Sequence, residues 1–89
     1  MKAGGHGIQV INKTNHGLSH ADKDALKANV AKGAGKVTQV IVEETQHRNV
    51  EYHALALKYV KGGQTFLYCK AAGGNFSDVL EQLKTCKKE

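Results

Sequence analysis

Residues 52–72 read YHALALKYVKGGQTFLYCKAA, with two adjacent glycines at the centre. Apolar and polar side chains alternate on both sides of the glycines, a pattern typical of β-strands. Glycine also tolerates the positive φ of a tight two-residue turn. We therefore expect strands over 52–60 and 64–72, joined as an antiparallel hairpin. A three-residue turn would regroup the side chains, whereas a two-residue turn places five large ones on one face: Leu55, Leu57, Tyr59, Phe66 and Tyr68.

Two segments before the hairpin are also predicted to be strands. Residues 36–44 are rich in β-branched side chains, and 8–12 form a shorter apolar run. Only a short polar connection separates 36–44 from the hairpin, so we expect the last three strands to form an antiparallel meander. The strand over 8–12 then completes a four-stranded sheet. Residues 1–7 are glycine-rich and contain no apolar run, which predicts a flexible leader before a single domain over 8–89.

Two helices are expected, one after the first strand and one at the end of the chain. Ser19 and Asp22 match the S-x-x-[DE] pattern of a helix N-terminus, and Gly33 and Gly35 predict that this helix ends near Lys32. Asn75 is the expected cap of the second helix, which has an apolar stripe at i, i+3, i+4 and i+7: Phe76, Val79, Leu80 and Leu83. The order β-α-β-β-β-α predicts an α+β two-layer sandwich, with a mostly antiparallel sheet and both helices on one face.

The composition describes a small basic protein. Its 89 residues carry 13 Lys and Arg against 8 Asp and Glu, a net charge of +5. No apolar run approaches the ~20 residues of a membrane-spanning helix, and the first residues do not resemble a signal peptide. We therefore expect a cytoplasmic protein without a membrane partner. Cys69 and Cys86 are the two cysteines. A disulfide is one alternative, and two reduced thiols are the simpler interpretation for a cytosolic protein.

The five histidines raise the question of catalysis or metal binding. His16 and His20 flank the first helix cap, His47 and His53 follow much later, and His6 lies in the leader. No carboxylate completes a metal-ligand set with them at a recognisable spacing, and no nucleophile or phosphate-binding motif is present. We therefore expect surface histidines, no cofactor, no metal site and no enzymatic activity.

The lysines support a stronger hypothesis. If the two helices lie side by side, their lysines could merge into one positive surface for a nucleic-acid backbone: Lys23, Lys27, Lys32, Lys84, Lys87 and Lys88. The alternative is that these lysines only keep the outer faces of the helices in water. The excess of positive charge is modest, and Arg48 is the only arginine available for bidentate phosphate contacts.

The order of several segments is similar to that of a known protein family. They are the first strand with the helix over 18–32, the strand over 36–43, the Gly62–Gly63 turn and the segment 70–84. Together they resemble the ribosome hibernation-promoting factor and ribosome-associated inhibitor family, over about residues 8–88. The resemblance implies a double-stranded-RNA-binding-like fold that occupies the decoding region of the small ribosomal subunit and blocks tRNA and mRNA. The family's contacts to rRNA phosphates would then fall on five lysines: Lys23, Lys27, Lys32, Lys84 and Lys87.

Two functional hypotheses follow. The first is a non-enzymatic module that binds rRNA on the small ribosomal subunit and regulates translation or ribosome hibernation by occlusion. The second is a small phage or host regulatory protein that binds a protein partner through its sheet face or an edge strand. The hairpin aromatics motivate this second hypothesis: Tyr52, Tyr59, Phe66 and Tyr68. A free sheet edge also leaves a homodimer open.

Overall fold

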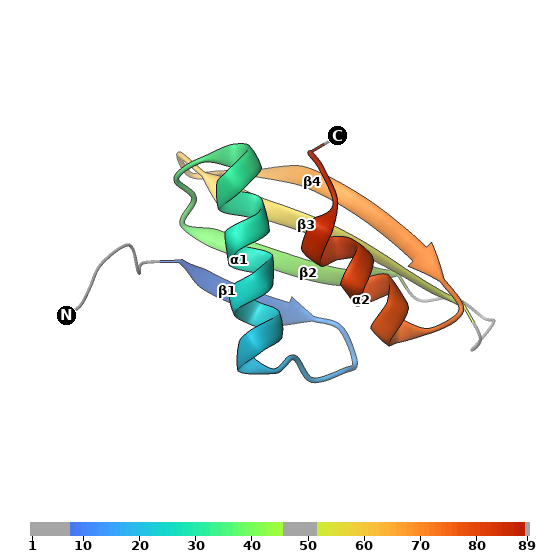
Figure 1. Cartoon of the computed structure of the whole chain (residues 1–89). Coiled ribbons are helices and arrows are strands. Elements are labelled where there is room, and N and C mark those ends of the chain that lie inside the picture. The colour runs from blue at the N-terminus through green and yellow to red at the C-terminus, as the bar shows by residue number, and fades with distance from the viewer. Residues whose placement is uncertain (1–7, 46–51, 89) are drawn as a thin grey trace.

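A computed structural model describes residues 8–45 and 52–88. Over these residues the chain forms, in order, β1 (Gln9–Lys13), α1 (His20–Ala34), β2 (Gln39–Thr45), β3 (His53–Lys61), β4 (Gln64–Gly73) and α2 (Phe76–Thr85). The strands make one sheet in the order β1-β2-β3-β4, and both helices lie on the same face of it (Figure 1). The predicted α+β two-layer sandwich is therefore confirmed. The predicted leader over 1–7 lies outside the described residues.

The direction of each strand follows from its connection. A helix joins β1 to β2, so the chain returns to the same end of the sheet and the two strands pair in parallel, with Gln9 opposite Gln39. Short connections make β2–β3 and β3–β4 antiparallel. This arrangement leaves β1 and β4 as the two edges of the sheet.

The hairpin between β3 and β4 has a two-residue turn, one of the two turn lengths that the sequence left open. Lys61 pairs with Gln64, and the intervening Gly62 and Gly63 have φ of 62° and 79°. Both angles lie in the left-handed region that favours glycine. Glycine at both positions therefore allows the strands to reverse within two residues.

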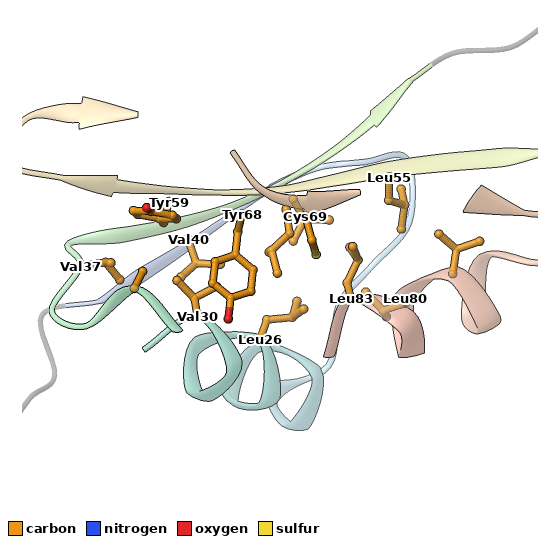
Figure 2. Close-up of a cluster of buried hydrophobic side chains, with 14 residues drawn as sticks. Leu26, Val30, Val37, Val40, Leu55, Tyr59, Tyr68, Cys69, Leu80 and Leu83 are labelled. Carbon is orange, nitrogen blue, oxygen red and sulfur yellow. The ribbon is translucent and has the colours of Figure 1, made fainter. Parts of the chain in front are cut away.

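A β-bulge in β4 changes which side chains reach the core. Leu57 pairs with Cys69 but its neighbour Lys58 pairs with Leu67, so Tyr68 is the extra residue on β4. Tyr68 and Cys69 are adjacent in sequence, yet each is only 2% exposed. Figure 2 shows both side chains on the helix side of the sheet. Tyr68 was predicted to share a face with Leu55, Leu57 and Tyr59, and the bulge places Cys69 on that buried face as well.

The core lies between the sheet and the two helices. Alternate residues of β2 and β3 point toward the helices, as the period of two in a strand requires. They meet apolar side chains from one face of each helix (Figure 2). The largest fully buried side chains come from all four of these elements: Leu26, Val30, Val40, Val42, Leu55, Leu57, Val79 and Leu83.

Helix α1 extends beyond its predicted end near Lys32. It continues to Ala34, and Gly35, with φ of 82°, is the capping residue. Gly33 is therefore inside the helix, where an added Cβ would overlap the ring and hydroxyl of Tyr68. That hydroxyl donates a 2.9 Å hydrogen bond to the Asn29 carbonyl oxygen. Gly33 thus permits close packing against β4 rather than ending the helix.

The two cysteines form a disulfide, so the interpretation of two reduced thiols is wrong. Cys69 lies in the middle of β4, and Cys86 immediately follows α2. Helix α2 runs back over β3 and β4, which brings its end above Cys69 with a Cα–Cα distance of 6.3 Å. The bond therefore fixes the residues after α2 to the sheet. The cysteines are 17 positions apart in the sequence, so the folded path of the chain brings them together.

Candidate functional site

The six predicted lysines occupy different environments. Lys84, in the last turn of α2, forms ion pairs with Asp22 and Glu81, each at 2.5 Å. Its hydrogen bonds to these carboxylates raise the pKa of Lys84 despite partial burial. The bond from Lys84 likewise lowers the pKa of Asp22, against a smaller opposing effect of burial. Lys84 therefore joins α2 to the first turn of α1.

Asp22 also belongs to the predicted helix cap. The Ser19 hydroxyl accepts the Asp22 backbone N–H at 3.1 Å, and the Asp22 carboxylate accepts the Ser19 backbone N–H at 3.3 Å. This reciprocal capping box satisfies backbone donors that the start of the helix leaves unpaired. Since Lys84 binds the same carboxylate, much of its charge is compensated within the fold.

Lys23 and Lys27 lie on the other flank of α1. Asn29 faces α2, because its side-chain amide donates 2.9 Å hydrogen bonds to the carbonyl oxygens of Leu83 and Cys86. Helical residues advance by about 100° each, which places Lys27 roughly 160° around the helix from Asn29. Lys27 also pairs with Asp24 at 3.3 Å. The side of α1 that carries these two lysines therefore differs from the side that meets α2.

Lys32 and Lys87 lie together at the other end of the helix layer. Both line a hollow of about 250 Å³ between the last turns of α1 and the chain after α2. We call it the Lys32–Lys87 hollow, and its remaining lining residues are Asn29, Gly33, Tyr68, Thr85 and Cys86. Neither lysine makes an ion pair with any residue in 8–45 or 52–88. Lys88 lies nearby in sequence, with its Nζ 5.7 Å from the Tyr59 ring centroid.

The structure therefore divides the six lysines into groups. Lys84 is held in ion pairs, while Lys23 and Lys27 lie on the flank of α1 away from α2. Lys32 and Lys87 share one hollow and carry charge that no described carboxylate neutralises. Lys23 and Lys88 also lack an ion pair among the described residues, but neither lines this hollow, which is where two such lysines lie together.

A second cluster of polar side chains lies near the start of α2. His16 comes from the β1–α1 connection, Glu44 from the end of β2 and His53 from the start of β3. Their nearest ligand atoms all lie within 4.8 Å of one another. We call these three residues the His–Glu cluster. The fold brings Glu44 between two of the histidines, a grouping that their spacing in the sequence did not indicate.

Hydrogen bonds hold the Glu44 carboxylate in one orientation. Its Oε2 lies 2.9 Å from His53 Nδ1 and 3.8 Å from His16 Nε2, while its Oε1 accepts the Asn15 backbone N–H at 3.3 Å. Burial alone would raise the pKa of Glu44. The contacts with His53, Asn15 and His16 outweigh burial and lower it. Phe76, the first residue of α2, covers the cluster, and its ring stacks on His16 with centroids 3.9 Å apart.

The alternation of side chains along β2 and β3 could have predicted part of this cluster. Val40 and Val42 point toward the helices, so Glu44 continues the same face of β2. His53 has the same relation to Leu55 on β3. The pairing of Glu44 with Leu55 then places the two side chains near the same end of the sheet. The position of His16 could not be predicted in this way, since it depends on the path of the connection between β1 and α1.

Comparison with known proteins gives a structural similarity only. No family model and no curated protein matches the sequence. The fold is similar to that of a ribosomal subunit interface protein from Coxiella burnetii, with a TM-score of 0.54 and 10% sequence identity. The similarity covers 86% of this chain and 85% of that chain. At such low identity it shows a common α+β architecture over nearly the whole length of both chains.

Within residues 8–45 and 52–88, neither helix is long and apolar enough to cross a bilayer.

Proposed function

We propose that this chain is a non-enzymatic RNA-binding module that associates with the small ribosomal subunit and regulates translation by occlusion. The observation that carries the proposal is the similarity of fold, over 86% of this chain, to a protein described as a ribosomal subunit interface protein. The net charge of +5 supports an RNA partner, because phosphate backbones attract lysine-rich surfaces.

The Lys32–Lys87 hollow is the proposed contact surface. Its two lysines are exposed, and one comes from the last turn of α1 and the other from the chain after α2, so they can approach neighbouring phosphates together. Lysine acts as a point charge and does not read base edges in a fixed geometry. Recognition would therefore rest on the shape and charge of folded RNA, with steep weakening as salt concentration rises.

Co-sedimentation with purified ribosomes tests this function. The full chain is centrifuged with small subunits at low and moderate salt, with a generic RNA duplex in excess as competitor. We expect stoichiometric binding that weakens with salt and resists the duplex. Absence of co-sedimentation at either salt concentration would refute the ribosomal proposal. Binding that the duplex abolishes would reduce the proposal to non-specific RNA binding.

A protein partner is the second candidate, and the open face of the sheet is the observation in its favour. A hollow of about 380 Å³ lies there, lined mainly by small side chains of β3 and β4 and by Tyr52, which is 44% exposed. Tyr59 and Tyr68 are buried, so they are not available to a partner on this face. This candidate predicts a complex that is insensitive to salt and is lost in Tyr52→Ser.

A further inference from the structure

The His–Glu cluster has the donor atoms of a transition-metal site. Two imidazole nitrogens and one carboxylate oxygen suit zinc and the neighbouring divalent metals, whereas calcium and magnesium prefer oxygen alone. The three residues come from three separate segments of the chain, and Phe76 covers them from a fourth. A metal ion here would therefore connect the β1–α1 connection to two strands of the sheet.

The distances fit a tetrahedral ion. Zinc binds nitrogen and oxygen at about 2.0–2.2 Å, which puts neighbouring ligand atoms of a tetrahedron roughly 3.4 Å apart. The Glu44 Oε2 distances to His53 Nδ1 and His16 Nε2, 2.9 Å and 3.8 Å, lie on either side of that value. The third separation, between the two imidazoles, is at most 4.8 Å. Small side-chain rotations would thus bring all three donors to one ion.

The carboxylate is already oriented for this task. Glu44 Oε1 accepts the Asn15 backbone N–H, so Oε2 is the atom directed at both histidines. Such outer-shell hydrogen bonds fix ligand orientation in known metal sites. A metal ion bound at His53 Nδ1 requires that the neutral ring carry its proton on Nε2.

We propose that His16 Nε2, Glu44 Oε2 and His53 Nδ1 bind one Zn²⁺ ion, with the fourth position open to water or to a ligand from a partner. The site contains none of the lysines of the Lys32–Lys87 hollow, so the two proposals can fail independently.

Titration of the metal-free full chain with Zn²⁺, followed by calorimetry, tests the site. We expect one ion per chain, and at least about a 10-fold loss of affinity in His16→Ala and in Glu44→Gln, since outer-shell changes alone cost 10–100-fold. His16 is exposed, which makes its removal compatible with folding. The matched control is His20→Ala, which removes a histidine only four residues away and should leave the affinity unchanged.

A second measurement identifies the ligand atoms. Long-range ¹H–¹⁵N spectra of the unmodified chain should show Zn²⁺-dependent shifts at His16 Nε2 and His53 Nδ1, and none at His20. Absence of zinc binding would overturn the proposal. Equal affinity in the unmodified chain, His16→Ala and Glu44→Gln would also overturn it, because the bound ion would then lie elsewhere.

Discussion

The helix layer is attached to the sheet by two regions of different chemistry. One region, which we call the tail clasp, consists of Asn29, Tyr68, Cys69 and Cys86 and uses a disulfide with hydrogen bonds to backbone carbonyls. The other is the His–Glu cluster, which uses two imidazoles and a carboxylate under Phe76. We therefore expect the tail clasp to respond to reducing agents, and the His–Glu cluster to respond to acid and, if it binds zinc as proposed, to metal ions. The two regions would then make one small core sensitive to different conditions in different places.

The largest expected effect comes from the disulfide of the tail clasp. The Cys69–Cys86 bond joins cysteines that are 17 positions apart in the sequence, and closing a loop of about that length stabilises the fold by about 3 kcal/mol through the unfolded state. Urea unfolding with and without dithiothreitol should show this difference.

The variant in which both cysteines are replaced by alanine supplies the control, and its midpoint should not depend on reductant. An unchanged midpoint for the unmodified chain in dithiothreitol would show that the clasp does not depend on a covalent bond.

The second expected effect concerns the close approach of α1 to β4. In Gly33→Ala the new Cβ would overlap the Tyr68 side chain, and such overpacking costs about 1–3 kcal/mol. Thermal unfolding measures the loss. Gly17→Ala is the control, because nothing lies within 4 Å of a Cβ there. Helix propensity alone favours alanine at position 33, so a stabilised Gly33→Ala would contradict the described packing.

The third prediction concerns acid sensitivity of the His–Glu cluster. The folded-state pKa of Glu44 lies below its ordinary value of 4.5, so its carboxylate contributes stability above that pH. This contribution is lost as the pH falls through the folded-state pKa. Glu44→Gln should therefore be less stable at pH 7 by about 1 kcal/mol, and the difference should disappear in acid.

Urea unfolding from pH 7 to pH 3, in EDTA to exclude metal ions, measures the free energy of unfolding against pH for the unmodified chain and for Glu44→Gln. If the free energies of unfolding of the unmodified chain and Glu44→Gln differ by the same amount at every pH, Glu44 does not contribute to the pH dependence.

The smallest expected effect separates Lys84 from Lys87. Lys84→Met removes the ion pairs with Asp22 and Glu81 and should cost up to about 1 kcal/mol, less at high salt. Lys87→Met should leave stability unchanged, because its ammonium group has no ion-pair partner among residues 8–45 and 52–88. Thermal unfolding at two salt concentrations distinguishes them. Equal losses would show that the ion pairs of Lys84 are energetically irrelevant.

Local chemistry made most of the elements predictable from the sequence. The β-branched run before Glu43, the Gly62–Gly63 turn and the Ser19–Asp22 capping box each depend on residues adjacent in the chain. Their positions agree with the structure because tertiary packing reinforces the local preferences. The order of elements then restricted the topology to an α+β sandwich.

The contacts that the sequence did not predict all depend on distant residues. Gly33 lies within a helix because of Tyr68, and the disulfide joins β4 to the end of α2. The His–Glu cluster likewise requires the register of β2 and β3 and the path of a connection. For the lysines, the sequence showed their number but not the ion pairs that engage Lys84.

Ribosome binding by two charge-reversal variants tests the proposed function most directly. Lys32→Glu/Lys87→Glu alters the hollow, and Lys13→Glu/Lys70→Glu alters residues outside it, each lowering the net charge from +5 by four to +1. Both variants are co-sedimented with small subunits at the same salt concentration. We expect the first to lose binding and the second to retain most of it. Equal binding by the two variants would contradict the assignment of the Lys32–Lys87 hollow as the RNA contact.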